Sequence, residues 1–176
     1  MAVDHVKSTF ITNSDANPSV MNTAGEGASG LTKTIEGSAV GVASSSIDAT
    51  YQFCRVPSNC KVKKVWMESA AQTVGTIDIG VYFATDGQGG KPLALLAAAA
   101  ISRTLFAAAY SVAAASQPTE ITNQSGNYTI DKRTQPLWQA AGLTADPGGF
   151  FDIVGTLATA ITTGTGRMGL TVQYVD

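Results

Sequence analysis

The chain has 176 residues, of which only 14% are charged, and its formal net charge is -2. A chain of this length is typical of a single domain that buries about 70% of the surface of its unfolded form, so it can build a hydrophobic core of its own. The low charge provides no extended basic surface, which argues against nucleic acid and against an anionic membrane as partners.

Residues 1–30 are rich in Ser, Thr, Asn, Gly and Ala and carry only isolated apolar side chains. This composition predicts an extended N-terminal arm, followed by one domain over residues 31–176. The arm lacks the apolar stretch of a signal peptide. The most apolar segment, "PLALLAAAAI", is too short to span a bilayer, so we expect a soluble protein.

From residue 31 onward, short runs alternate polar and apolar side chains with the period of a β-strand. Two runs predict a half-buried strand with an apolar face: Ile47, Ala49, Tyr51 and Phe53 in the first, and Ile77, Ile79, Val81 and Phe83 in the second. A third run, residues 60–69, loses the alternation at Val65, Trp66 and Met67. Burial on both faces or a β-bulge would explain that loss.

Two cysteines, Cys54 and Cys60, flank the turn-like segment "RVPSN". Without a secretory signal we expect reduced thiols, as in cytoplasmic proteins. Two strands joined at this turn could bring the cysteines close together, so a single disulfide is the alternative.

Residues 93–115 are rich in alanine, with Leu93, Ala97, Ile101 and Leu105 four residues apart, and predict a buried helix. The later half also fits a strand. Residues 133–143, "RTQPLWQAAGL", predict a second, short helix with Thr134 as its N-cap, Pro136 in its first turn and Gly142 at its end.

Two further strands are predicted near the C-terminus. The first has Phe151, Ile153 and Leu157 on one face, and the second has Met168, Leu170, Val172 and Tyr174 on one face. Short strands at this spacing with one or two short helices predict a mainly β fold, an antiparallel β-sandwich.

The pattern G-x-G-x-x-G, which is typical of dinucleotide-binding loops, occurs as "GEGASG" from Gly25 and as "GTGRMG" from Gly164. Such a loop must be followed by a helix whose N-terminus holds the phosphates. Strand-like residues follow both matches, so we expect no bound nucleotide. We interpret Gly164 and Gly166 as the flexible residues of a hairpin turn, with Arg167 pointing to solvent or to a partner.

The sequence offers no convincing catalytic or metal site. Its one histidine, His5, lies in the predicted arm, so no histidine is available to a rigid catalytic site or zinc site, and we expect no cofactor and no metal. Asp78 and Asp152 fall between apolar strand positions, which predicts solvent-facing carboxylates; their use as a catalytic pair remains the least favoured hypothesis. Trp66 and Trp138 have apolar neighbours and are expected in the core, although stacking on sugar rings is the alternative.

Several segments together resemble small structural proteins of tailed bacteriophages, the decoration or cement proteins of the head: "VKSTFITNSDANP", "RVPSNCKVKKV", "TIDIGVYFATDG" and "PLWQAAGLTADPGGFFDIVGTL". The resemblance implies a jelly-roll-like sandwich located in the virion, on the outer surface of the capsid. It implies a non-enzymatic protein that cements neighbouring subunits of the major capsid protein, with self-association as a homodimer on the lattice.

For such a protein we expect partner contacts from the arm and from the start of the last strand. The expected residues are Val3, Val6, Lys7, Phe10, Ile11 and Arg167. In the arm they would fill apolar pockets or add a strand to a neighbour's edge. A carbohydrate-binding or tail-associated sandwich is the alternative function.

Overall fold

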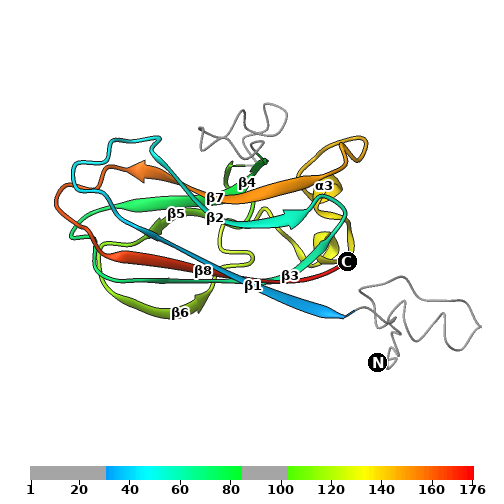
Figure 1. Ribbon diagram of the computed structural model, residues 1–176, viewed down its shortest axis with the longest axis horizontal. Coiled ribbons are helices and arrows are strands. Elements are labelled where there is room, and N and C mark those ends of the chain that lie inside the picture. Colours follow the sequence, from blue (N-terminus) through cyan, green and yellow to red (C-terminus); the bar gives the residue numbers. More distant parts are fainter. Residues whose placement is uncertain (1–30, 85–102) are drawn as a thin grey trace, which may run out of the picture.

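A computed structural model describes residues 31–84 and 103–176. In those residues eight β-strands form two sheets packed face to face (Figure 1). The strands are β1 (Thr32–Val40), β2 (Thr50–Pro57), β3 (Lys61–Ser69), β4 (Thr76–Phe83), β5 (Ala107–Ser111), β6 (Ser116–Glu120), β7 (Phe150–Thr159) and β8 (Arg167–Val175). Two short helical turns, η2 (Ile130–Thr134) and α3 (Leu137–Ala140), lie between β6 and β7.

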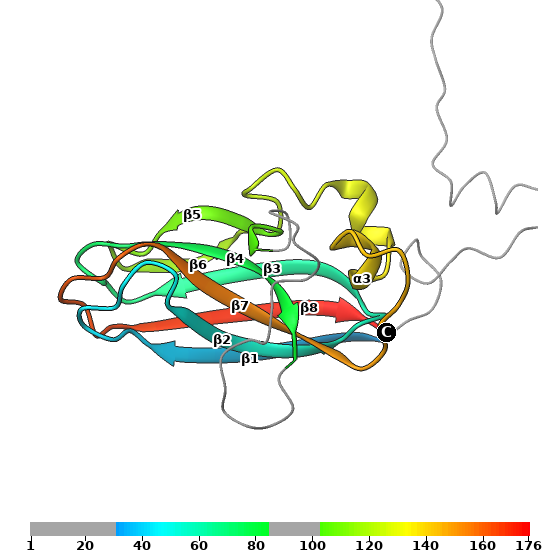
Figure 2. The ribbon, with the colours of Figure 1, turned by 90° about the horizontal axis from the view of Figure 1, so that it is seen from above.

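The order of the strands is β1-β8-β3-β6 in one sheet and β2-β7-β4-β5 in the other. The strand pairs of both sheets are antiparallel. Figure 2 shows β1 and β2 along one long side of the sandwich and β5 and β6 along the other. Eight strands that alternate between two sheets in this order form a jelly roll. The predicted antiparallel β-sandwich is therefore confirmed.

The core lies between the sheets and is filled by alternate residues of the strands. On β8, Met168, Leu170 and Val172 are buried, as predicted from the period of two. Phe106 and Tyr128 are among the largest fully buried side chains, and their rings pack edge to face with their centres 4.9 Å apart. Burying a large apolar side chain contributes about 1.5–3 kcal/mol, so these layers supply most of the driving force for folding.

β-Bulges explain where the simple alternation fails. The register of β3 against β8 shifts between Val62 and Lys64, which allows Val62, Val65 and Met67 all to face the core. A second bulge in β2, between Gln52 and Cys54, has the same effect. The predicted bulge is confirmed, but Ile47 precedes β2 and is exposed, so its prediction as a half-buried strand residue is wrong.

The helix predictions are corrected in part. Residues 93–102 lie outside the described residues, whereas Ala107–Ser111 is β5, so the strand alternative holds there. Pairing with β4 and burial of Ala107 override the helix propensity of alanine. Gly142 ends the second helix with a φ of +94°, as predicted. The prediction of Thr134 as the N-cap of this helix is wrong, because Thr134 is the last residue of η2 and Pro136 occupies the N-cap position of α3.

The segment containing "GTGRMG" crosses from one sheet to the other, because β7 and β8 belong to different sheets. It is therefore not a hairpin. Among the glycines that the structure describes, those with positive φ are Gly75, Gly126, Gly142, Gly148 and Gly149. Gly164 and Gly166 are not in this set, so the prediction that they supply unusual backbone angles is wrong.

Candidate functional site

Four loops meet at one end of the sandwich, at the left in Figure 1. They comprise residues 41–49, 70–75, 112–115 and 160–166, and we call this surface the loop end. Backbone hydrogen bonds join the loops: Gly41 N–H donates to the Gly166 carbonyl at 2.9 Å, and Gln72 N–H donates to the Val112 carbonyl at 3.0 Å. The four segments are thus held as one surface although they are far apart in the sequence.

Gln72 is the buried centre of the loop end. Its Nε2 donates to the carbonyl of Gly166 at 2.6 Å and to the carbonyl of Ala70 at 3.2 Å. A Cβ at Gly164 would collide with the backbone of Gln72, and a Cβ at Gly166 would lie 2.7 Å from Gln72 Nε2. These two glycines are therefore required for close packing, which replaces their predicted role as hairpin residues.

The loop end also contains strained backbone. Ser44, Asp48 and Thr73 have φ values of 64°, 67° and 68°. Each such conformation costs about 1–3 kcal/mol in a residue other than glycine, and the β-branched Thr73 is least suited to it. Strain of this kind persists only where the surrounding contacts fix the backbone, so the loops have a defined shape.

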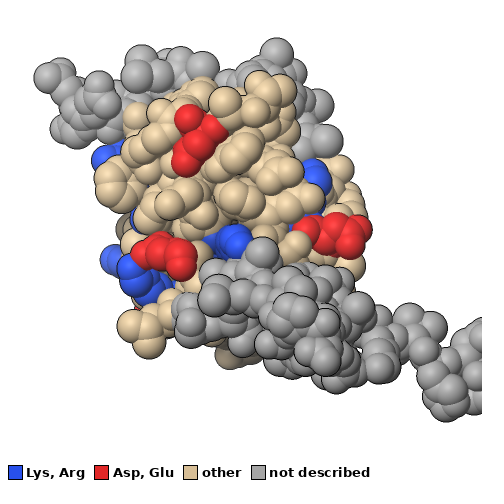
Figure 3. All heavy atoms as spheres, turned by 90° about the vertical axis from the view of Figure 1, so that its right-hand side faces the viewer, with Lys and Arg blue, Asp and Glu red and all other residues tan. Residues whose placement is uncertain are grey.

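Apart from Asp48, the exposed side chains of the loop end are small or apolar. Val42, Ile47 and Val74 are 60%, 58% and 44% exposed. The single charged residue in these four segments is Asp48. The opposite end, which carries α3, has acidic and basic side chains on its surface (Figure 3) and also exposes Ile130 and Phe150, so low charge is what distinguishes the loop end. Depletion of charge and exposure of apolar side chains are features of the central part of protein–protein interfaces.

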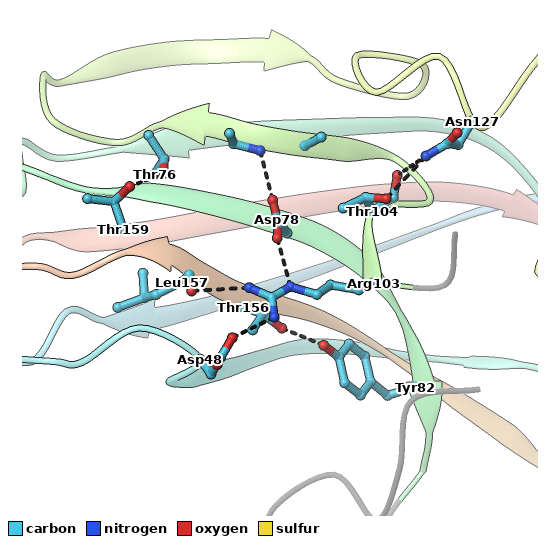
Figure 4. Close-up of polar contacts among 12 residues, drawn as sticks. Asp48, Thr76, Asp78, Tyr82, Arg103, Thr104, Asn127, Thr156, Leu157 and Thr159 are labelled. Carbon is cyan, nitrogen blue, oxygen red and sulfur yellow. Dashed lines mark hydrogen bonds and ion pairs between the residues drawn. The ribbon is translucent and has the colours of Figure 1, made fainter. Parts of the chain in front are cut away.

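Asp48 is neutralised by Arg103, which also binds Asp78 on β4 and so links the loop end to the β2-β7-β4-β5 sheet (Figure 4). Arg103 Nη1 donates to Asp48 at 2.5 Å, and Nε donates to Asp78 at 2.7 Å. The other oxygen of Asp78 accepts the Ala109 N–H at 2.8 Å. Burial alone would lower the pKa of Arg103, but the two carboxylates outweigh it and the pKa is raised.

The outer face of the β2-β7-β4-β5 sheet carries a second paired carboxylate. Arg55 binds Asp152 through Nε at 2.7 Å and Nη2 at 3.0 Å. Asp78 and Asp152 are 7% and 3% exposed, so the prediction that they face solvent is wrong: each lies under the guanidinium group that neutralises it. Two carboxylates held by separate arginines are poorly placed to act as an acid–base pair. No group of three or more His, Cys, Asp or Glu residues able to hold a metal ion occurs within residues 31–84 and 103–176.

Arg167, a predicted partner residue, lies at the rim of a shallow groove on the outer face of the other sheet. The groove has a volume of about 280 Å³, and Glu36, Ser38, Glu68 and Gly169 are among the residues that line it. Arg167 is exposed and donates to Ser38 Oγ at 2.9 Å. Its role in partner binding stays a prediction. The predicted arm residues Val3, Val6, Lys7, Phe10 and Ile11 lie outside the described residues.

The two tryptophans differ. Trp138 packs against the core, as predicted. Trp66 lies between the buried Val65 and Met67, so its ring is on the outer face of the sheet, half-buried, and its prediction as a core residue is wrong. Lys64 Nζ lies 5.6 Å from the centre of the Trp66 ring, a cation–π arrangement.

Cys54 and Cys60 are buried free thiols, as expected. Burial raises the pKa of both thiols to about 12. A thiol with so high a pKa is almost entirely protonated at neutral pH and is a poor nucleophile. Neither cysteine therefore provides a reactive site.

The strand order gives the described residues a jelly-roll fold, and the loop end has the low charge and exposed apolar side chains that are common in protein–protein interfaces. Sequence reasoning missed this surface, although one signal was present: residues 41–49, 70–75, 112–115 and 160–166 contain a single charged residue, Asp48. Within residues 31–84 and 103–176, no helix is long and apolar enough to cross a membrane.

No family model and no curated protein matches the chain. Among solved structures, the chain is similar to a chain of the capsid asymmetric unit of cyanophage Pam1, with a TM-score of 0.55 and 19% identity over 92% of this chain and 96% of that chain. A chain of the acid-stable capsid of Helicobacter pylori bacteriophage KHP30 aligns with a TM-score of 0.32 and 13% identity, over 83% of this chain and 94% of that chain. The first likeness supports the jelly-roll fold over nearly the whole length of both chains.

Proposed function

We propose that this protein is a non-enzymatic structural protein of a phage virion, which binds the outer surface of the head and cements neighbouring subunits of the major capsid protein. The observation that carries the proposal is the jelly-roll fold, shared over 92% of the chain with a chain of a phage capsid asymmetric unit. The sequence segments that resemble phage decoration proteins support the same function independently of the fold.

The loop end is the surface through which the protein would bind the capsid. Its only charged residue is Asp48, which is paired with Arg103, and Val42, Ile47 and Val74 expose apolar side chains there. Its four loops are cross-linked by hydrogen bonds and packed around Gln72, so little conformational freedom would be lost on binding. A rigid apolar surface of this kind would span the junction between two capsid subunits.

The mechanism of cementing would be mass action. A protein that binds only the assembled lattice stabilises that state, by about 2.7 kcal/mol per site when its free concentration is one hundred times Kd. Each bound copy would therefore oppose the dissociation of the subunits beneath it. An arm over residues 1–30, a single domain over residues 31–176 and a homodimer on the lattice are further parts of the proposal.

Binding to heads assembled without the protein tests the proposal. Purified full-length protein is mixed with such heads, and bound protein is measured by co-sedimentation and located by electron cryo-microscopy. We expect density on the outer surface and a higher temperature of head disruption. Wild-type protein that does not sediment with heads would refute the proposed function.

Charge substitutions identify the binding surface in the same assay. Val42→Glu and Ile47→Glu place a carboxylate in the proposed interface and should weaken binding at least tenfold. Ile130→Glu is the matched control, because Ile130 is 76% exposed and belongs to η2, away from the loop end. Equal binding by all three variants would assign the contact to another surface.

Carbohydrate binding is the second candidate, and the outward position of Trp66 is the observation that favours it. Sugar rings stack on exposed aromatic faces, but Lys64 lies over the Trp66 ring and competes for that face. Glycan-array binding that is lost in Trp66→Ala and retained in Trp138→Phe would support this function instead.

A further inference from the structure

The strand β1 is an edge of its sheet and has the properties of a strand that can accept another. It pairs with β8 residue for residue, from Thr32 opposite Val175 to Val40 opposite Arg167, without a bulge. Its nine residues include no proline, and most of its side chains are exposed. Its second side pairs with no other strand in the described part of the chain.

The other three edges of the two described sheets carry features that block strand addition. β6 has only five residues and contains Pro118. β2 is interrupted by its bulge and ends at Pro57. β5 has five residues and a left-handed residue, Ala109. Proline, bulges and short length are the means by which natural sheets prevent edge pairing, so β1 is the edge that remains open.

We propose that β1 accepts a strand from a second copy of this chain, formed by residues 3–11 of the neighbouring arm. That segment, "VDHVKSTFI", combines β-branched and aromatic residues with no glycine or proline. Residues 12–30, between it and the sandwich, contain Pro18 and three glycines and serve as a linker. The exchanged strand would extend the β1-β8-β3-β6 sheet by one member.

The pairing has a definite register. Glu36 on β1 is exposed and forms no ion pair with another residue that the structure describes. An antiparallel strand with Lys7 opposite Glu36 places opposite charges on the same face. In that register Val6 pairs with Gly37 and Phe10 pairs with Lys33. Both apolar side chains would then lie on the face of the sheet that is turned toward the core, next to the half-buried Ile35.

The linker is long enough for the segment to reach the β1 of a neighbouring copy. A flexible linker of 19 residues has a root-mean-square span of about 25 Å. Pairing with the chain's own β1 would close the same linker into a loop at a modest entropic cost, so the chain's own arm is the competing occupant that the test must separate. A neighbour in contact, with a radius of gyration of about 15 Å, lies within the relaxed span.

Cross-linking between two distinguishable full-length copies tests the exchange. One copy carries Lys7→Cys and a size tag, the other carries Glu36→Cys, and the mixture is treated at high protein concentration with a short thiol-specific cross-linker. The native cysteines are buried and should not react. The expected product is a covalent dimer of a tagged and an untagged chain.

Glu68→Cys is the matched control, because Glu68 is an exposed residue on the same face of the sheet but belongs to the inner strand β3. A yield with Glu36→Cys no greater than with Glu68→Cys overturns the proposal. A chain carrying both Lys7→Cys and Glu36→Cys that cross-links only within itself also overturns it, in favour of its own arm. No heads are present, so either failure leaves the proposed binding to the head standing.

A charge exchange provides the second test. Lys7→Glu and Glu36→Lys should each weaken self-association in analytical ultracentrifugation by about two- to fivefold, because each places like charges opposite one another. The two substitutions in one chain restore the pair and should restore association. Additive weakening in the double variant would contradict the register.

Discussion

The substitution Gly164→Ala separates the two roles that a glycine in "GTGRMG" can have. A phosphate-binding or hairpin glycine supplies backbone freedom, whereas Gly164 has an ordinary φ and lies against the backbone of Gln72. An added methyl group would collide with Gln72 Cα, C and O, which cannot move aside as a flexible side chain would. The loop must then shift, and overpacking of this kind costs about 1–3 kcal/mol.

The shift would also disturb the hydrogen bond from Gln72 Nε2 to the Gly166 carbonyl, which adds about 0.5–1.5 kcal/mol. The expected loss of stability is therefore about 2–4 kcal/mol, or a fall in Tm of about 4–16 °C for a domain of this size. Urea unfolding followed by circular dichroism measures it, with the midpoint lowered and the slope m unchanged.

Gly126→Ala is the control, because Gly126 has a φ of +79° but nothing within 4 Å of an added Cβ. It should cost about 1 kcal/mol from backbone strain alone. A Gly164→Ala variant within 0.5 kcal/mol of wild type would refute the packing of the 160–166 loop on Gln72.

Three further outcomes are expected. Arg103→Leu should lower stability by about 2–3 kcal/mol in the same urea assay, because it leaves Asp78 buried without a cation, and adding Asp78→Asn should recover part of the loss. Cys54 and Cys60 should react with a thiol reagent at pH 8 only after unfolding, and rapid reaction of the native protein would contradict their burial. Folding raises the pKa of both thiols to about 12, whereas an unfolded cysteine has a pKa of about 8.5. Burial of the protonated thiols therefore stabilises the fold fully below about pH 8.5, and this contribution is lost as the pH rises toward 12. Urea unfolding measured at a series of alkaline pH values would detect the loss.

The fold was predictable where strands bury one face. The alternation in residues 167–175 reports directly which side chains face the core, because successive residues of a strand point to opposite sides. In residues 76–83 it identifies Ile77, Ile79 and Val81 as core residues, but the prediction of a half-buried strand is wrong there, because Asp78 and Tyr82 on the other face are buried too. Alternation does not report which strands pair. The assignment of β7 and β8 to different sheets depends on contacts between distant residues, and the hairpin predicted at Gly164 was wrong for that reason.

Local propensity misled where tertiary contacts override it. The alanines of β5 favour a helix by themselves, but hydrogen bonding to β4 and burial against the core fix them as a strand. Asp78 and Asp152 occupy outward positions of their strands and were expected in solvent. Arg103 and Arg55, both distant in the sequence, cover them, and no pattern in the sequence pairs these residues.

The loop end and the start of β1 lie at opposite ends of the sandwich. β1 begins at Thr32, opposite Val175 near the C-terminus, and runs to Val40 at the loop end (Figure 1). Nine strand residues span about 30 Å, so β1 starts at the end away from the proposed capsid-binding surface. If the loop end binds the capsid, we expect residues 1–30, which precede β1, to meet other bound copies and not the capsid. Removal of residues 2–20 should then leave binding to heads intact and abolish cross-linking between copies, whereas loss of head binding on that deletion would assign the arm to the capsid.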